Sequence, residues 1–227
     1  MRAMGISMIF LLVLLFGCQQ QDNAGDPEPV NGETPNGEEN GDNQNAVEEE
    51  PADELELSQF LKPDGSTAKF LGDGNEFASY TEKTTWLDDQ YVGTIVDNGG
   101  VTMMTIYKIG DEKIEIVYKE PVDLDAAFPD MEDIKSMQPI ETYFAKPIEV
   151  GTSFGNWKII KIDEPVETPY KNFDEAIVIE ESGENYVNRK YFVEGLGEVK
   201  TEYIMDTDQG EKYIVTSTLE SVSTEDE

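Results

Sequence analysis

Short stretches in which apolar and polar residues alternate recur along the chain from about residue 77, and most of them end at a turn signal. Alternation with period two is typical of strands that bury one face, and Gly, Asn and Asp clusters of hairpin length join strands that pair with each other. The pattern therefore predicts an all-β domain of antiparallel sheets built from meanders, arranged as a sandwich or as a half-barrel or clasp.

Turn signals set the expected limits of the strands, because Gly and Asn tolerate positive φ. The expected strands are 77–87, 91–96, 101–107, 114–118, 157–162, 175–180, 186–193, 199–205 and 212–222. The expected turns are 88–89, 97–100, 110–111, 182–183, 195–197 and 206–210. Helix is expected only near 123–137, as one or two short turns at 124–128 and 131–137.

A spacing of 95 or 96 residues relates the two halves of this pattern. Phe77 and Phe173 are 96 residues apart, as are Tyr107 and Tyr203, and Tyr186 follows Tyr91 by 95. The order of strands and turns around each set is similar. Two duplicated halves are one explanation, and chance alignment in a Tyr-rich β chain is the other.

The first 18 residues have the features of a bacterial export signal. Arg2 supplies positive charge, and an apolar run from Ile6 to Phe16 is too short to span a bilayer as a free helix. The run ends in Leu-Phe-Gly-Cys18, which resembles a lipobox. The resemblance implies that Cys18 carries a diacylglyceryl thioether and further acylation such as palmitate, and that residues 1–17 are a removed signal peptide. The alternative is an ordinary signal peptide with an incidental Cys.

Composition divides the rest of the chain. Residues 18–54 contain no aromatic, Lys or Arg residue and hold 12 Asp or Glu, which predicts a disordered acidic tether. Residues 55–222 hold the aromatic residues that a β core needs, and residues 223–227 are expected to be a frayed acidic tail. In this view the tether is a spacer between a membrane anchor and the folded domain.

Composition also excludes several classes of function. The net charge of the 227 residues is −33, which argues against binding nucleic acid. The chain has no His, which excludes a His-based triad, a His general base and a His metal ligand. Its single Cys excludes an internal disulfide and a Cys-based zinc site. The sequence indicates no catalytic residue and no cofactor.

The second half of the chain resembles a module of predicted bacterial cell-surface lipoproteins that have no assigned activity. The residues that carry the resemblance are Gly151 to Trp157, Thr168-Pro169 with Phe173, and Tyr191-Phe192 followed by Gly195-Leu196-Gly197 and Val199-Lys200. It implies an extracytoplasmic antiparallel β fold in which Gly195 and Gly197 form a tight turn and Trp157 and Phe173 anchor the core.

Two acidic segments are candidate metal sites, although we assign no metal ligand. Asp206-Thr-Asp208-Gln-Gly210-Glu211 is similar to a calcium loop, but it lacks the later Glu and fits a hairpin turn better. The other segment surrounds Phe128, and carboxylates of this kind suit Ca²⁺ or Mg²⁺. Its acids are Asp123, Asp125, Asp130, Glu132 and Asp133.

The leading hypothesis is a lipoprotein anchored at Cys18 on the extracytoplasmic face of a bacterial envelope, with a non-catalytic β domain that binds an envelope ligand or protein partner. One alternative is a carboxylate-dependent hydrolase of envelope glycans, which needs two acids about 5–10 Å apart. Another is a carrier that holds an apolar ligand in a cavity. Trp86, Tyr91, Tyr170 and Tyr186 are candidates for stacking on a sugar ring or on a partner chain.

Overall fold

The computed structural model describes residues 55–207 and 210–224. The strands of the first half are β1 (Ser66–Asp73), β2 (Tyr80–Trp86), β3 (Tyr91–Asp97), β4 (Thr102–Ile109), β5 (Lys113–Val122) and β6 (Glu141–Ala145). Those of the second half are β7 (Ser153–Phe154), β8 (Trp157–Glu167), β9 (Asn172–Ser182), β10 (Tyr186–Val193), β11 (Gly197–Asp206) and β12 (Lys212–Thr224). The predicted all-β antiparallel class is confirmed.

Two short helices accompany the strands, the 3-10 turn η1 (Leu57–Phe60) and α1 (Met131–Ser136). The helix expected at 131–137 is therefore confirmed, but the helical turn expected at 124–128 is wrong. Phe128 precedes Pro129, which disfavours helical backbone, and the Phe128 ring instead lies against Gly93, where an added Cβ would come within 2.3 Å of it. Within the described residues, no helix has the length and hydrophobicity that crossing a bilayer requires.

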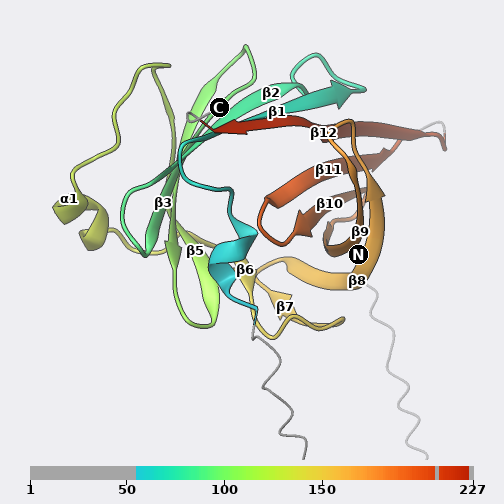
Figure 1. Cartoon of the computed structure of the whole chain (residues 1–227). Helices are drawn as coiled ribbons and strands as arrows, with labels where there is room; N and C mark the ends of the chain where they lie inside the picture. Colours follow the sequence, from blue (N-terminus) through green and yellow to red (C-terminus); the bar gives the residue numbers. More distant parts are fainter. Residues whose placement is uncertain (1–54, 208–209, 225–227) are drawn as a thin grey trace, which may run out of the picture. The chain divides into compact units, whose positions relative to one another are not determined.

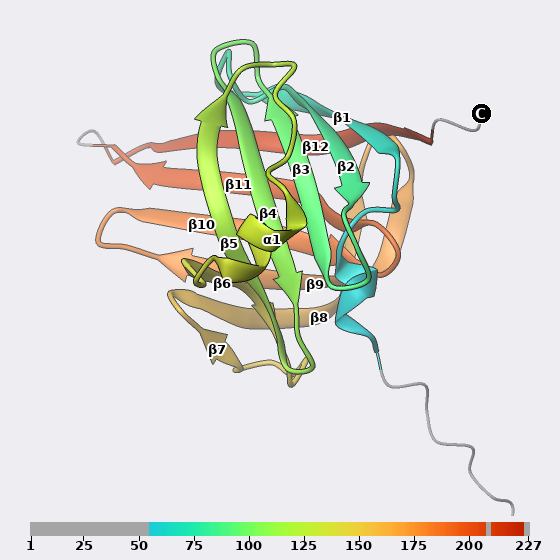
Figure 2. The ribbon, with the colours of Figure 1, turned by 90° about the vertical axis from the view of Figure 1, so that its left-hand side faces the viewer.

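All twelve strands form one sheet, in the order β6-β5-β4-β3-β2-β1-β12-β11-β10-β9-β8-β7. Each half is a meander, and the halves join where β1 pairs with β12. Figure 2 shows β3, β4 and β5 crossing in front of β8 to β12, so the sheet turns back and its halves face each other. The end strands β6 and β7 approach without pairing, and the sheet nearly closes.

The main core lies between the two facing halves. Phe144 of β6 contacts Phe60 of η1 and Phe192 of β10, with ring centroids 4.7 and 4.9 Å apart. Figure 1 shows η1 between the halves, where Leu57 and Phe60 are buried. The segment before β1 therefore contributes to the core of the sheet, which the sequence pattern did not predict.

The turn between β10 and β11 holds η1 in place. The Gly195 N–H donates to the Gln59 carbonyl at 2.8 Å. Gly197 has φ 64°, and a Cβ there would lie 2.6 Å from the Phe60 carbonyl oxygen. Only glycine allows this close approach together with this backbone, so the predicted tight turn also has a packing role.

A second apolar cluster covers the outer face of the first half. Ile134 of α1 packs with Tyr91, Ile106 and Val117, which belong to β3, β4 and β5. Figure 2 shows α1 in front of these strands. Tyr91 is consequently buried, and its predicted role as a surface stacking residue is wrong.

Candidate functional site

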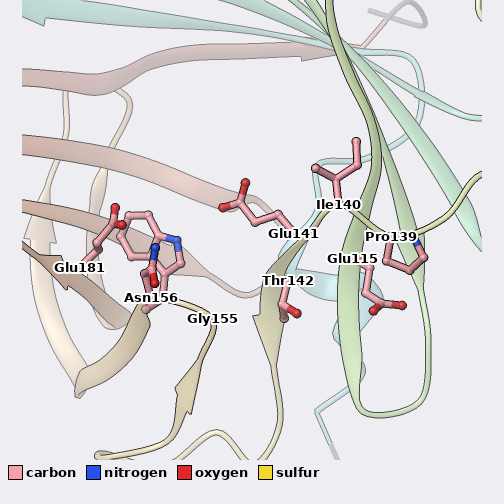
Figure 3. A pocket seen from close by; sticks show the side chains of 9 residues that line it. Glu115, Pro139, Ile140, Glu141, Thr142, Gly155, Asn156 and Glu181 are labelled. Atoms are coloured by element: carbon pink, nitrogen blue, oxygen red, sulfur yellow. The ribbon is translucent and has the colours of Figure 1, made fainter.

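Two neighbouring hollows share the side chain of Trp157, and we call them together the Trp157 groove. The first hollow has a volume of about 420 Å³. It is lined by Glu115, Pro139, Ile140, Glu141, Thr142, Gly155, Asn156, Trp157 and Glu181 (Figure 3). The second hollow, of about 270 Å³, is lined by Trp157, Asn188, Arg189, Lys190, Thr201, Glu202, Tyr203, Val215 and Ser217.

Trp157 is positioned by the hairpin that joins β7 to β8. Phe154 and Trp157 are paired across a two-residue turn, and Gly155 has φ 55°, as a type II′ turn requires at its first central position. The Phe154 side chain is buried and lies 5.9 Å from Phe144, which ties the hairpin to the core. The Trp157 ring is only partly buried at the edge of that core. It is thus held firmly while part of it stays accessible.

The register of β10, β11 and β12 places six side chains on the floor of the second hollow. Cross-strand partners share a face, and so do residues two apart in a strand. The two rows are Lys190, Thr201 and Ser217, and Asn188, Tyr203 and Val215. Arg189 and Glu202 pair with each other on the opposite face. The floor is therefore mostly polar, with one cation and one aromatic ring.

Lys190 is fixed between two aromatic rings. Its Nζ lies 5.0 Å from the Tyr143 ring centroid and 5.4 Å from the Trp157 ring centroid, and it forms a 3.0 Å ion pair with Glu198. Cation–π contacts of this kind hold an indole in a defined orientation. Lys190 lines the second hollow and not the first, so its ammonium group covers Trp157 from the side of the second hollow.

Three carboxylates line the first hollow, and they come from three strands. Glu115 pairs with Lys113, and Glu141 lies 3.9 Å from the ammonium of Lys119. Glu181 accepts a hydrogen bond from the Asn188 amide at 3.2 Å. Figure 3 shows the Glu141 side chain extending toward Asn156 and Glu181, whereas the Glu115 carboxylate points away from them. The acidic wall of the first hollow thus consists of Glu141 and Glu181.

A buried polar layer lies behind the groove. Lys62 is 4% exposed, pairs with Glu82 at 3.0 Å and donates to the Glu198 carbonyl at 2.9 Å. Burial raises the pKa of the Tyr107 and Tyr143 phenols well above the usual range, and the charges of Glu82 and Glu198 raise each pKa further, so both stay neutral.

Little space is left inside the sheet at this layer. The small hollow among these polar residues has a volume of about 10 Å³, which is at most room for one water molecule. Above and below it, the facing halves are filled by the buried aromatic and aliphatic side chains of the core. Between the described residues of this layer, there is no room for an apolar ligand.

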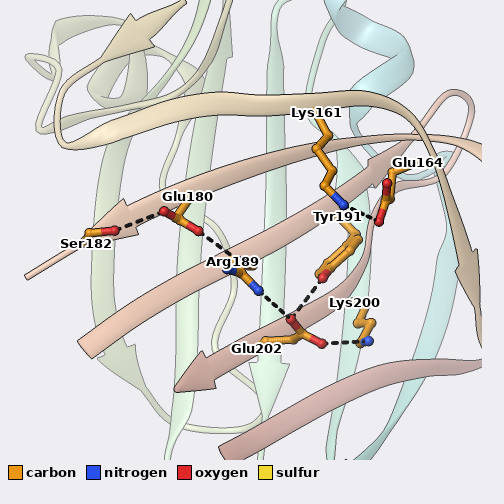
Figure 4. A network of polar contacts seen from close by, with 8 residues as sticks. All are labelled: Lys161, Glu164, Glu180, Ser182, Arg189, Tyr191, Lys200 and Glu202. Carbon is orange, nitrogen blue, oxygen red and sulfur yellow. Dashed lines mark hydrogen bonds and ion pairs between the residues drawn. The ribbon is translucent and has the colours of Figure 1, made fainter. Parts of the chain in front are cut away.

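The outer face of β9, β10 and β11 carries an ion-pair network (Figure 4). Arg189 donates to Glu180 at 2.9 Å, and Lys200 lies 2.8 Å from Glu202. Burial favours the neutral form of Glu202, but hydrogen bonds from Lys200 and Tyr191 outweigh it and lower its pKa. Adjacent residues of a strand point to opposite faces of the sheet. This network therefore connects the strands on the outer face, whereas the Lys190 side chain points into the groove.

A third hollow, of about 540 Å³, lies near the start of the folded part. It is lined by Gln59, Phe173, Asp174, Glu175, Val193, Glu194 and Gly195. Its acids are exposed, and the Phe173 ring is buried and covered by the Lys171 ammonium at 4.8 Å. It therefore offers a solvated acidic surface without an accessible ring.

The predicted site residues have different outcomes. Cys18 and the proposed tether lie outside the described residues, as does Asp208 of the predicted calcium-like loop. In the described part of that loop, the Thr207 hydroxyl bonds the Glu211 backbone, which is the hairpin-turn interpretation. The acids around Phe128 do not gather, and among the described residues no three acidic or Cys side chains form a metal site.

None of the four aromatic candidates lines the Trp157 groove. Trp86 is partly buried and donates its indole N–H to the Lys62 carbonyl at 3.0 Å. Tyr186 stacks on Tyr203 at 6.0 Å, and Tyr170 is exposed but lines neither hollow. Trp157, expected to be a core anchor like Phe173, packs against the core and also forms the wall that the two hollows of the groove share. The Gly-Asn turn immediately before it was the available signal.

Comparisons with known proteins identify no family for this chain. No protein-family model and no curated protein sequence matches it. One similar solved structure is a candidate exported protein with a YmcC-like fold from Bacteroides fragilis. It has 12% identity and a TM-score of 0.44, and the match covers 73% of this chain and 98% of that one.

Another similar structure is a candidate lipoprotein from Parabacteroides distasonis. It has 9% identity and a TM-score of 0.48, and the match covers 75% of this chain and all of that one, at 100%. At this level of similarity, neither structure bears on what this chain binds or does.

Proposed function

We propose that this protein is a lipoprotein anchored through Cys18 on the extracytoplasmic face of a bacterial envelope, and that its β domain binds a ligand in the Trp157 groove without transforming it. The apolar run that ends in Leu-Phe-Gly-Cys18 supports the anchor and the location. The tether of residues 18–54 would let the domain reach a ligand at a distance from the membrane.

One observation carries the binding role. The partly buried Trp157 ring is the common wall of two open hollows, and Lys190 and a core-anchored hairpin fix its position. The first hollow lies within the range of about 300–1,000 Å³ that small-molecule sites occupy. A rigid aromatic surface surrounded by polar groups binds a ligand with little loss of conformational entropy.

Intrinsic fluorescence tests the binding role directly, because the chain has only two Trp residues. In the Trp86→Phe variant, Trp157 is the single reporter. We expect its emission to shift saturably when the soluble polysaccharide and peptide fractions of a bacterial envelope are added. Fractions that leave the emission unchanged at all concentrations would contradict the proposal.

Processing tests the anchor separately. Cys18→Ala should yield an uncleaved precursor or release the protein from membranes, because no other Cys is available for lipidation. Membrane attachment and processing that match the wild type would contradict lipidation at Cys18, whatever the outcome of the binding assay.

A second candidate function, glycan hydrolysis, is favoured by the presence of Glu141 and Glu181 in the same hollow. Two carboxylates beside a bound sugar suffice for that chemistry. If the groove is catalytic, the wild type releases reducing ends from a bound glycan over time, and Glu141→Gln or Glu181→Gln abolishes the release while binding persists. A glycan that is bound and recovered intact supports the non-catalytic proposal.

A further inference from the structure

We infer that the ligand of the Trp157 groove is a glycan chain without acidic groups, which lies across Trp157 with neighbouring sugar residues in the two hollows. This inference rests on the proposed binding function and adds the chemical class and the placement of the ligand.

The groups around Trp157 match the two surfaces of a sugar ring. The apolar C–H face of a sugar packs on an aromatic ring, and its hydroxyls both donate and accept hydrogen bonds. Because Lys190 covers the indole from the second hollow, the ring face toward the first hollow is the one available for packing. Glu141, Glu181 and the Asn156 amide line that hollow beside the ring.

The second hollow continues the same chemistry beyond the indole. Thr201 provides a hydroxyl, Asn188 an amide and Tyr203 a second ring, whereas the buried Ser217 hydroxyl already donates to the Ala78 carbonyl at 2.6 Å. The hollows share Trp157, so a chain that fills both must pass over its edge. A single small molecule would use one hollow only, whereas two linked sugars use both.

Charge excludes acidic glycans. Residues 55–227 carry 37 acids and 15 Lys or Arg, and the first hollow adds an acidic wall from Glu141 and Glu181. Both cations that line the second hollow are already paired, Lys190 with Glu198 at 3.0 Å and Arg189 with Glu180 at 2.9 Å. The carboxylate of a uronic acid would be repelled by these acids, and the hydrogen bonds of its hydroxyls do not offset that repulsion. Neutral and amine-bearing sugars instead donate hydrogen bonds to the carboxylates of the groove.

The width of the sheet opening argues against a peptide strand. β6 and β7 are the two end strands of the sheet, so each has one unpaired edge, the feature to which proteins that bind by strand addition pair a peptide. An inserted strand needs about 4.8 Å on each side, or roughly 9.6 Å in total. Cα atoms of β6 and β7 come within 8 Å of each other, so no strand fits between them where they approach.

The test uses the full-length lipidated protein in detergent micelles on an array of neutral, amine-bearing and acidic oligosaccharides, followed by calorimetry. The probes for calorimetry are tetramers of N-acetylglucosamine, glucosamine and galacturonic acid, together with the best array ligand. We expect the best ligand to be neutral or amine-bearing. Trp157→Ala should weaken its affinity at least tenfold, whereas Tyr170→Ala, which removes an exposed ring outside the groove, should not change it.

Charge is tested by the double variant Glu141→Gln with Glu181→Gln. It should weaken the neutral or amine-bearing ligand and reduce the discrimination against galacturonic acid, whereas the exposed control Glu220→Gln should do neither.

The outcomes separate the two proposals. A best ligand that is acidic, or an envelope peptide that binds more tightly than any glycan, overturns the glycan inference but leaves the binding function intact if Trp157→Ala abolishes binding. If no array member binds, the glycan inference is wrong. If ligands bind and Trp157→Ala has no effect, both proposals are wrong.

Discussion

Replacing Lys62 by Met should destabilise the domain more than any other single charge deletion in its interior. The Lys62 side chain is 3% exposed, and its Nζ contacts Glu82 at 3.0 Å and the Glu198 carbonyl at 2.9 Å. It thereby connects the segment after η1 to β2 in one half and to β11 in the other. Methionine keeps the volume and removes the charge, its hydrogen bonds and its cation–π contact with Phe70 at 5.1 Å.

The loss of stability follows from the Glu82 carboxylate, which stays buried without its partner after the substitution. At 3.0 Å the Coulomb attraction is about 5 kcal/mol with an effective dielectric constant of about 20. Removing one partner of a buried pair costs about 3–5 kcal/mol, because the other charge stays buried without compensation. The Glu82 side chain is 15% exposed, so we expect about 3 kcal/mol. For a domain of this size, that lowers Tm by about 6–12 °C.

Thermal and urea unfolding, followed by circular dichroism at pH 7, measure this effect. The matched control is Lys161→Met, since Lys161 and Glu164 lie 2.7 Å apart but have side chains 53% and 31% exposed, and an exposed pair contributes at most about 1 kcal/mol. The double variant Lys62→Met with Glu82→Leu should recover most of the loss. Equal losses for Lys62→Met and Lys161→Met, or no recovery in the double variant, would refute the reasoning.

Three other predictions concern packing and pH. Removing residues 1–54 should leave Tm within about 2 °C of the value for the full-length protein. Removing residues 1–62 also deletes η1 from the core and should lower the free energy of unfolding by more than about 5 kcal/mol. Equal melting temperatures of the two truncated proteins would contradict this role of η1. Gly197→Ala should cost at least about 2 kcal/mol, because strain at φ 64° adds to a clash with the η1 carbonyl, whereas Gly195→Ala, with open space around it, should cost about 1 kcal/mol. The lowered pKa of Glu202 gives stability that is present above its unfolded pKa and lost as pH falls through the folded pKa, so Glu202→Gln should show a flatter decline of Tm below about pH 4.5 than the wild type.

Local sequence signals predicted the strands that hairpin turns delimit. β10 spans Tyr186–Val193 as expected, and β3 spans Tyr91–Asp97, one residue longer than expected. β1, β6 and β7 were missed, although Asp64-Gly65 precedes β1 and Gly155-Asn156 follows β7. β1 also alternates, with Ala68 and Phe70 buried and Lys69 exposed between them, so its signal was present in the sequence.

Exposure of aromatic side chains could not be predicted in the same way, because it depends on contacts that are distant in sequence. Tyr91 is buried because α1 covers β3 some 40 residues later in the chain. Trp157 is accessible because its hairpin lies at the end of the sheet, where no further strand covers it. Period-two alternation shows which residues share a face, but not which face another element will cover.

The position of the candidate site can also be compared with the spacing of 95 or 96 residues that relates the two halves of the sequence. Two of the three residue pairs 95 or 96 apart relate β3 to β10 and β4 to β11, and in the strand order each pair of strands is separated by the same five positions. The third pair is not equivalent, because Phe77 is exposed before β2 and Phe173 is buried in β9. The same shift relates β1 to β8, β2 to β9 and β5 to β12, so two five-stranded meanders run in the same direction around the sheet. Duplication itself stays a prediction, but this arrangement is the one it requires.

β6 and β7 have no counterpart under that shift, and they are the two strands whose edges remain unpaired. The first hollow is built largely from them and their flanks, since Glu141 and Thr142 belong to β6 and Gly155 and Asn156 form the turn after β7. A structural repeat would therefore account for the closed scaffold, whereas the additional strands account for the opening and for the groups that line it. Around the first hollow, substitutions that alter ligand binding without altering stability should accordingly concentrate in residues 139–142 and at Asn156, outside the two five-stranded meanders.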